Sequence, residues 1–132
     1  MLPVDLQHTE SLDKAIKVAA DLVKLYQAEL IFVGVTGNVP GSIASDYSEF
    51  VIALETFAAT HAKRHDILIA SKGIASLDVA AELDTILVDA AAEIQADLIV
   101  MASHIPGLAD YVFSSNAGYL ANHAKLSVFV VR

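Results

Sequence analysis

The chain has 132 residues, of which 55% are hydrophobic and none is cysteine, and its mean hydropathy is +0.56. This length favours one domain with a sizeable core, and the absence of cysteine excludes a disulfide framework and thiolate chemistry. The formal net charge of −8 at pH 7 argues against nucleic-acid and anionic-membrane partners, because a field of that sign repels both.

The opening residues, MLPVDLQHTE, lack the basic stretch of a signal peptide. No apolar run approaches the ~18 residues that a membrane span needs. We therefore expect a cytoplasmic protein without a membrane partner. Its lysines and arginines are scattered, and only Lys63 and Arg64 are adjacent, so the sequence contains no basic stripe.

Hydrophobic periodicity predicts strands that alternate with helices along the chain. Residues 2–6 read as the end of a short strand. Thr9 or Ser11 is the expected N-cap of an amphipathic helix over 10–27. The apolar, β-branched run at 30–35 is typical of a strand that is covered on both faces.

The second half of the chain repeats this alternation. A loop rich in Gly, Pro, Ser and Asn over 36–45 precedes a helix over 46–64, and a third strand lies within 67–76. A helix over 79–95 leads to a second strand of the two-face-buried type at 97–102. The chain then closes with a short helix through Ala117, Leu120, Ala121 and Ala124 and a strand at 127–131.

Strands that alternate with helices predict a parallel sheet with right-handed crossovers. Ligands of such sheets bind beyond the carboxyl ends of the strands, where the strand order reverses. This places Asp5, the loop after Val35 and residues 101–116 on one edge of the sheet. The carboxylate of Asp5 can accept hydrogen bonds from a ribose hydroxyl or a base amine there, or it can serve only as a cap for the following helix.

Ser114, Ser115 and Asn116 lie where the last helix is expected to begin. Free N–H groups and the helix dipole make such a start an anion seat, although the same residue types are common N-caps that need no ligand. Ala102 and Ile105 stand where a close phosphate would favour glycine.

Asp110 lies near this seat in the sequence, and the nearest cation is Lys125. A triphosphate would therefore need Mg²⁺ or the backbone amides alone, whereas a neutral or singly phosphorylated ligand would suffer less from the carboxylate. His104 is placed to touch a ligand at the same edge. His61, which belongs to the apolar pattern of the helix over 46–64, is one helical turn from His65. Without a third ligand we expect a solvated, partly amphipathic helix end and no metal site.

Three stretches of the chain resemble the universal stress proteins of the UspA type. "PVD" at 3–5 is similar to the opening of that family, "ADLIVMASH" at 96–104 to its fourth strand and turn, and "SSNAGYLANHAKLSVFVVR" at 114–132 to its last helix and closing strand. The resemblance covers residues 1–132. It implies one domain with the adenine-nucleotide α-hydrolase-like fold, a five-stranded parallel sheet of order 3-2-1-4-5 with helices on both faces.

The resemblance also implies a nucleotide site. Nucleotide-binding members carry G-x2-G-x9-G-S/T after the fourth strand. Here the first two glycine positions hold Ala102 and Ile105. The last two positions match Ser114 and Ser115, and the spacing between Ile105 and Ser114 is one residue shorter than in the motif. By position, Asp5 would hold the base or ribose. The full set of implied cofactor-binding residues is Pro3, Val4, Asp5, Val35, Met101, Ala102, Ser103, His104, Gly107, Ser114, Ser115 and Asn116.

The implied ligand is ATP or AMP, with Mg²⁺ accompanying ATP. The resemblance further implies a homodimer, through antiparallel pairing of the strands at 127–131. The uncharged, β-branched sequence there fits an edge strand, and pairing with its own copy about a twofold axis removes that edge.

The leading hypothesis is a dimeric stress-response protein that binds an adenine nucleotide with a degenerate glycine motif. The alternative is a nucleotide-free member of the family that acts as a protein–protein interaction module. A third hypothesis is an enzyme, at most a weak ATPase. The sequence lacks the positioned lysine, the arginine finger and the metal-binding carboxylates that phosphoryl transfer uses. G-x-S-x-G, Walker and G-x-G-x-x-G motifs are absent, and a flavodoxin-like electron carrier would want aromatic residues such as tryptophan beside its flavin.

Overall fold

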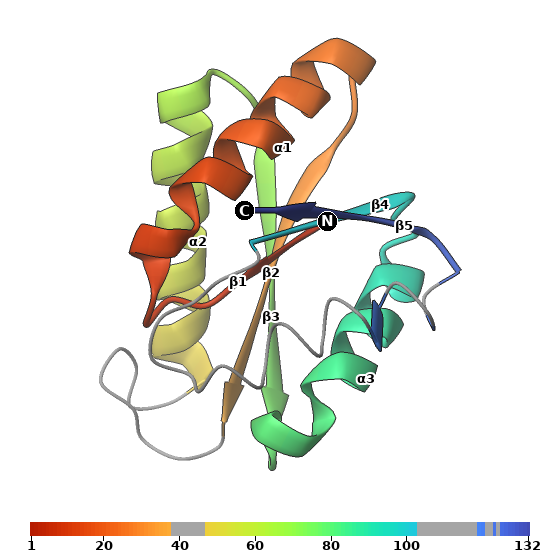
Figure 1. Ribbon diagram of the computed structural model, residues 1–132. Helices are drawn as coiled ribbons and strands as arrows, with labels where there is room; N and C mark the ends of the chain where they lie inside the picture. Colours follow the sequence, from red (N-terminus) through yellow and green to blue (C-terminus); the bar gives the residue numbers. More distant parts are fainter. Residues whose placement is uncertain (38–46, 103–118, 121–122, 124) are drawn as a thin grey trace.

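The computed structural model describes residues 1–37, 47–102, 119–120, 123 and 125–132. Strands and helices alternate along the chain (Figure 1). The elements are β1 (Leu2–Val4), η1 (Thr9–Ser11), α1 (Asp13–Tyr26), β2 (Leu30–Gly37), α2 (Tyr47–His65), β3 (Ile69–Ser76), α3 (Val79–Glu93), β4 (Leu98–Ala102) and β5 (Ser127–Val131). Every helix of this described part is too short or too polar to cross a membrane.

The strands form two parallel sheets, one of order β1-β2-β3 and one of order β4-β5. The expected single five-stranded sheet of order 3-2-1-4-5 is therefore wrong. β1 packs beside β4, but no strand ladder joins the two, and the backbone hydrogen bonds to β4 in the described chain come from Met1, directly before β1. The amino group of Met1 donates to the carbonyl of Leu98 over 2.8 Å, and the N–H of Val100 donates to the carbonyl of Met1 over 3.0 Å. These two bonds place β1 beside β4 without a strand ladder between them.

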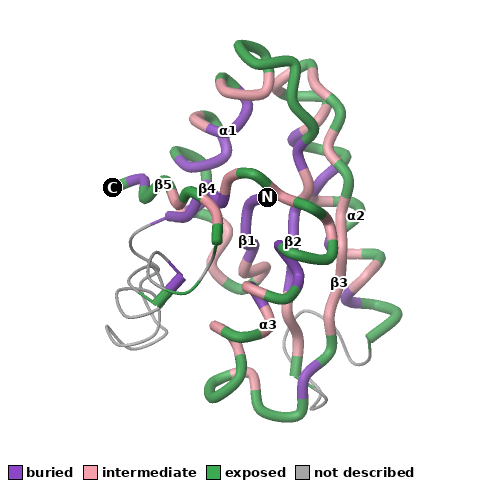
Figure 2. Tube along the Cα trace, turned by 90° about the vertical axis from the view of Figure 1, so that its right-hand side faces the viewer, coloured by how far each residue is buried: buried purple, intermediate pink, exposed green. Residues whose placement is uncertain are grey.

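Helices cover both faces of the strands. One apolar cluster joins α1 and α2 to Leu2 and Phe32, and a second cluster joins α3 to Val33 and Ile99. Because Phe32 and Val33 are neighbours in β2, this strand is covered on both faces, as its apolar sequence predicts. Figure 2 shows buried residues along β1, β2 and β4 and on α1.

Glycine lets α2 lie close to β2. A Cβ atom on Gly34 would stand 2.8 Å from Cζ of Phe50 and 3.1 Å from Cδ2 of Leu54. Gly73 lies opposite Gly34 in β3, where a Cβ atom would stand 3.0 Å from Cγ2 of Val51. Gly73 is thus an interior residue of a strand that packs against the helix, and the third strand runs on to Ser76.

The start of α1 differs from the prediction. Thr9–Ser11 form a short 3-10 helix, and the N-cap of α1 is Leu12, with no side-chain capping bond. Leu12 is only 2% exposed and belongs to the first apolar cluster. Burial of this side chain, and not a hydroxyl cap, therefore determines where the helix begins.

The three long helices end in the same way. Gln27 after α1, Asp66 after α2 and Gln95 after α3 have left-handed backbones, with φ of 52°, 53° and 53°. At the first of these ends, the N–H of Gln27 bonds to the carbonyl of Val23. A left-handed residue reverses the chain after a helix, and here it leads into the amino end of the next strand.

The described part of the predicted last helix comprises Tyr119, Leu120 and His123, which are helical. Leu120 is fully buried in the second cluster, as its place in the apolar pattern indicates. Ala117, Ala121 and Ala124 lie outside the described residues.

Candidate functional site

The carboxyl ends of the parallel strands meet at one edge of the fold, here called the carboxyl edge. The chain passes from β1 to β2 on one side of β1 and arrives on its other side with β4. The strand order thus reverses at β1, and such a reversal is where open parallel sheets bind ligands. The first residue after β1 is Asp5, so its side chain lies at this reversal.

The turn that follows β1 holds the carboxylate of Asp5. Oδ1 accepts a hydrogen bond from the N–H of Gln7 over 2.8 Å, and Oδ2 lies 2.9 Å from Nδ1 of His8. Asp5 therefore shapes the turn between β1 and η1 and does not cap α1, whose N-cap is Leu12. Each carboxylate oxygen has a second lone pair, so both can still accept from a ligand.

His8 is a residue of this edge to which the sequence assigned no role. Its Nδ1 faces Asp5, and its Nε2 has no hydrogen-bond partner among the described residues. The backbone fixes the ring further, because the N–H of His8 bonds to the carbonyl of Asp5 over 3.2 Å and Ser11 Oγ donates to the carbonyl of His8 over 2.9 Å. The sequence signal that could have predicted this contact is the spacing of Asp5 and His8, which lie three residues apart directly after a strand.

The other predicted site residues of the described strands belong to the core. Pro3 and Val4 are buried in β1, Met101 and Ala102 are buried in β4, and Val35 is half-buried in β2. Buried side chains inside strands leave mainly the backbone at the strand ends for contact with a ligand. The remaining predicted residues, which lie outside the described part of the chain, are Ser103, His104, Gly107, Ser114, Ser115 and Asn116.

A polar cluster closes the carboxyl end of β3. The buried hydroxyl of Ser76 donates to Glu82 over 2.6 Å and accepts from the N–H of Asp78 over 3.1 Å. The carboxylate of Asp78 accepts from the N–H of Ala81 over 3.1 Å and caps α3. These bonds satisfy the first turn of α3, so we assign the cluster a structural role.

Asp84 of α3 faces the last helical segment. Burial raises the pKa of Asp84, and the nearby imidazole of His123 lowers it in part. Oδ1 of Asp84 is buried without a hydrogen-bond partner among the described residues. The ring of His123 stacks on Tyr119, with a centroid separation of 3.9 Å. Burial therefore makes Asp84 easier to protonate than a solvent-exposed aspartate.

His61 does not lie on a solvated helix end, contrary to the prediction. It is 6% exposed, its ring lies 4.5 Å from Phe57 and 6.2 Å from Phe32, and Nδ1 has no hydrogen-bond partner in the described chain. Burial is the main cause of the lowered pKa of His61. Within the described ranges, no group of three or more His, Cys, Asp or Glu residues is placed to hold a metal ion.

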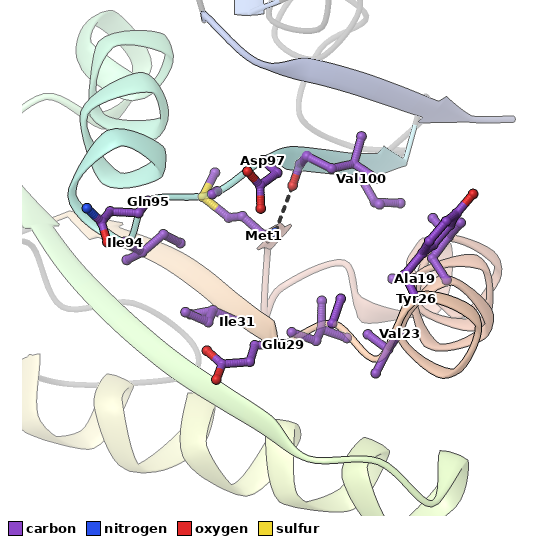
Figure 3. A pocket seen from close by; sticks show the side chains of 15 residues that line it. Met1, Ala19, Val23, Tyr26, Glu29, Ile31, Ile94, Gln95, Asp97 and Val100 are labelled. Atoms are coloured by element: carbon purple, nitrogen blue, oxygen red, sulfur yellow. Dashed lines mark hydrogen bonds between the residues drawn. The ribbon is translucent and has the colours of Figure 1, made fainter.

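A cavity of about 560 Å³ lies at the opposite, amino edge of the strands, between α1, the start of β2 and the turn from α3 to β4 (Figure 3). Leu22, Val23 and Leu30 contribute apolar lining, and Glu29 and Asp97 contribute carboxylates. The cavity is therefore distinct from the carboxyl edge.

The structure defines a parallel α/β protein in which Asp5 directly follows β1, at a reversal of strand order. The sequence profile of the Universal stress protein family matches residues 1–132, and the chain belongs to that family. The resemblance read from the sequence motifs is thereby confirmed.

Solved structures share this fold. A universal stress protein in complex with cAMP is 21% identical, with a TM-score of 0.67 over 99% of this chain and 95% of that chain. A universal stress protein from Archaeoglobus fulgidus is 18% identical, with a TM-score of 0.70 over 99% and 96%. The Archaeoglobus fulgidus universal stress protein in complex with dAMP is 17% identical, with a TM-score of 0.65 over 99% and 94%.

Proposed function

We propose that this protein binds an adenine nucleotide at the carboxyl edge, beside Asp5, and acts in the stress response as a cytoplasmic homodimer. The observation that carries the proposal is the carboxylate of Asp5, held by two local hydrogen bonds at the point where β1 ends between β2 and β4. Related structures with this fold are described in complex with cAMP and with dAMP, which supports the same ligand class.

In this proposal the carboxylate of Asp5 accepts from the ribose hydroxyls or the adenine amine, because an anion suits the donors of a nucleoside and repels its phosphates. The backbone of Val35 meets the adenine, and residues 101–104 line the path to the phosphates. Ser114, Ser115 and Asn116 hold the phosphates through backbone N–H groups and hydroxyls.

We propose a singly phosphorylated adenine nucleotide as the preferred ligand, with ATP binding more weakly and only with Mg²⁺. Asp110 precedes the phosphate-holding residues, and the nearest cation in the sequence is Lys125. In this proposal each added phosphate is repelled by the carboxylate of Asp110, and no basic residue nearer in the sequence than Lys125 offsets that repulsion. The nucleotides named in the two related complexes, cAMP and dAMP, are both monophosphates.

The test is calorimetric titration of AMP and ATP, each with and without Mg²⁺, into nucleotide-free protein. Asp5→Asn keeps an acceptor for the N–H of Gln7 and removes the charge. We expect it to weaken AMP binding about tenfold or more, since hydrogen bonds to a charged group are worth roughly 1.5–3 kcal/mol.

Glu29→Gln is the matched control, because it removes a carboxylate from the amino edge and should leave AMP affinity unchanged. A folded Asp5→Asn protein with the affinity of its parent would contradict the proposed role of Asp5. No heat at millimolar AMP would favour the alternative, a nucleotide-free interaction module. Ser114→Gly separates the two further, because it should tighten phosphate binding in the first case and be silent in the second.

The proposed homodimer uses β5. In the described chain β5 pairs with β4 alone, so its other edge is open. Phe129 and Val130 are 47% and 41% exposed there. Antiparallel pairing of β5 with its own copy would satisfy the open backbone groups and remove this edge.

A further inference from the structure

His8 lies on the carboxyl edge, in the turn that joins β1 to η1, and both its backbone and its ring are held there. Its N–H bonds to the carbonyl of Asp5 over 3.2 Å, and its carbonyl accepts from Oγ of Ser11 over 2.9 Å. Nδ1 of the ring lies 2.9 Å from Oδ2 of Asp5. The side chain of His8 is nevertheless 25% exposed, against 18% for Asp5, so part of the fixed imidazole is open to solvent.

The bond to Asp5 determines which ring nitrogen of His8 carries the hydrogen. An ionised carboxylate can only accept, so the neutral ring donates from Nδ1. Nε2 then keeps a free lone pair, and it has no hydrogen-bond partner among the described residues. A carboxylate on one nitrogen of an imidazole also makes the other nitrogen more basic. Asp5 therefore sets Nε2 of His8 as a hydrogen-bond acceptor.

Asp5 and His8 together present two acceptors that lie close to each other. Oδ1 of Asp5 already accepts from the N–H of Gln7, and Oδ2 faces His8, so each carboxylate oxygen has one lone pair left for a ligand. Oδ2 and Nε2 are separated by one hydrogen bond and the width of one imidazole ring. Two hydroxyl groups on neighbouring carbon atoms can each donate to one of these acceptors.

The order of the strands indicates which part of a nucleotide meets this pair. β1 lies between β2 and β4. In the proposed nucleotide site the adenine meets the backbone of Val35 in β2, and the phosphates lie beyond β4. The ribose between them therefore lies at the end of β1, beside Asp5 and His8. A carboxylate and an imidazole lone pair suit the donors of a ribose and repel phosphate oxygens.

We propose that His8 is a second ribose-binding residue and that it makes the site selective for ribonucleotides. This inference rests on the proposed nucleotide site at Asp5. One hydroxyl of the ribose 2′,3′-diol donates to the carboxylate of Asp5, and the other donates to Nε2 of His8. A nucleotide without one of these hydroxyls leaves an acceptor without a donor, and such a site rejects the deoxy analogue.

The test is calorimetric titration of AMP, 2′-deoxy-AMP and 3′-deoxy-AMP into nucleotide-free protein at pH 8. We expect each deoxynucleotide to bind at least about tenfold more weakly than AMP, because each leaves one acceptor unpaired. His8→Phe should weaken AMP binding and should abolish the discrimination against one of the two deoxynucleotides, while Asp5 retains the other. His8→Gln has an amide oxygen that can accept in place of Nε2, so it should restore part of that discrimination.

The three nucleotides separate a ribose contact from a purely structural role of His8. A loss of equal size for all three in His8→Phe would show that His8 only positions Asp5, and would overturn the inference. Equal binding of AMP and both deoxynucleotides by the parent chain would also overturn it, while leaving the proposed nucleotide site intact. No heat from AMP would contradict the proposed site itself, and the ribose contact with it.

The hydrogen on the ring of His8 is tested without any nucleotide. We expect the ¹⁵N chemical shifts of the imidazole at pH 8 to show the hydrogen on Nδ1 and none on Nε2. A hydrogen on Nε2 in the free protein would overturn the inference whatever the calorimetry shows. On addition of AMP the Nε2 resonance should move, because a hydroxyl now donates to it. An unchanged Nε2 resonance at saturating AMP would exclude the contact.

Discussion

The imidazole of His61 is an ionisable group inside an apolar cluster. The unfolded chain takes up a proton at this histidine near its ordinary pKa of about 6.5, while the folded chain does so only at lower pH. Acid therefore favours the unfolded state. The stability contributed by neutral His61 is complete above the ordinary pKa and is lost as the pH falls through the folded pKa.

We expect His61→Phe to flatten this acid dependence. At pH 7.5 the variant should be at least as stable as its parent, because a buried nitrogen without a partner costs about 1–3 kcal/mol. The advantage should grow at pH 5.5, where the parent loses stability. Urea unfolding of both proteins at the two pH values measures this directly.

Neighbouring charges define the control for this experiment. Asp13 raises the pKa of His61, while Arg64 and His65 lower it. His65 stacks on His61 at 6.0 Å but is less buried. His65→Gln should therefore retain most of the acid dependence of the parent. If the stability of this variant no longer changed with pH, the acid dependence would belong to His65 and not to His61.

Sequence patterns predicted Asp5 at the candidate site but not His8. An apolar run that stops at an aspartate identifies a strand end, which is a local property of the sequence. The contact of His8 with Asp5 depends on the turn that brings the two side chains together, and no periodicity encodes such a turn. The helical pattern included His61, but its contact with Phe32 was not predicted, since Phe32 comes from another element.

At the scale of elements, the packing of α2 on β2 depends on Gly34. We expect Gly34→Ala to destabilise the fold by roughly 1–3 kcal/mol, because its Cβ would stand 2.8 Å from the ring of the buried Phe50. Chemical denaturation measures the loss. Gly73→Ala is a milder comparison, since its nearest contact is 3.0 Å.

A double-mutant cycle separates this contact from other effects of alanine in a strand. Phe50→Leu removes the ring atom that the new Cβ meets. Gly34→Ala should therefore cost less in the Phe50→Leu background than in the parent. Equal costs in both backgrounds would show that the ring is not the obstacle.

The centres of the helices and strands were predictable, and several of their ends were not. The pattern predicted a helix over 46–64 and the structure has Tyr47–His65, because the apolar spacing of a helix reports directly on its buried face. The start of α1 was missed because the anchor is the buried Leu12, and burial against other elements is not a local signal. Gly73 obscured β3 because the reason for the glycine lies in α2.

At the scale of the whole molecule, the expectation that failed was a single continuous five-stranded sheet. Parallel pairing and helices on both faces follow from the alternation of elements. Continuity of the sheet depends on the length of its middle strand, and β1 has only three residues. How far β1 pairs with a strand on each side depends on β1, β2 and β4 together. No single stretch of sequence therefore predicts it.

The proposed dimer is tested at β5. We expect Val130→Pro to give monomers or aggregates, because proline has no N–H and interrupts strand pairing. Val130→Lys keeps the N–H and adds a positive charge from each copy to the proposed interface, and these charges would repel each other. Light scattering should report a monomer for the Val130→Lys variant. Its thermal unfolding should remain cooperative, which shows that the monomer is folded. An unchanged dimer in both variants would contradict pairing through β5.

The left-handed residues Gln27, Asp66 and Gln95 all connect a helix to the amino end of a strand, away from Asp5. None of the three is a glycine, so each turn is held in a backbone that its side chain disfavours. These turns can therefore be tightened by sequence change without disturbing the opposite end of the strands. The left-handed turns lie at the amino end of the strands and the proposed ligand site lies at the carboxyl end, so stability and ligand choice can evolve separately.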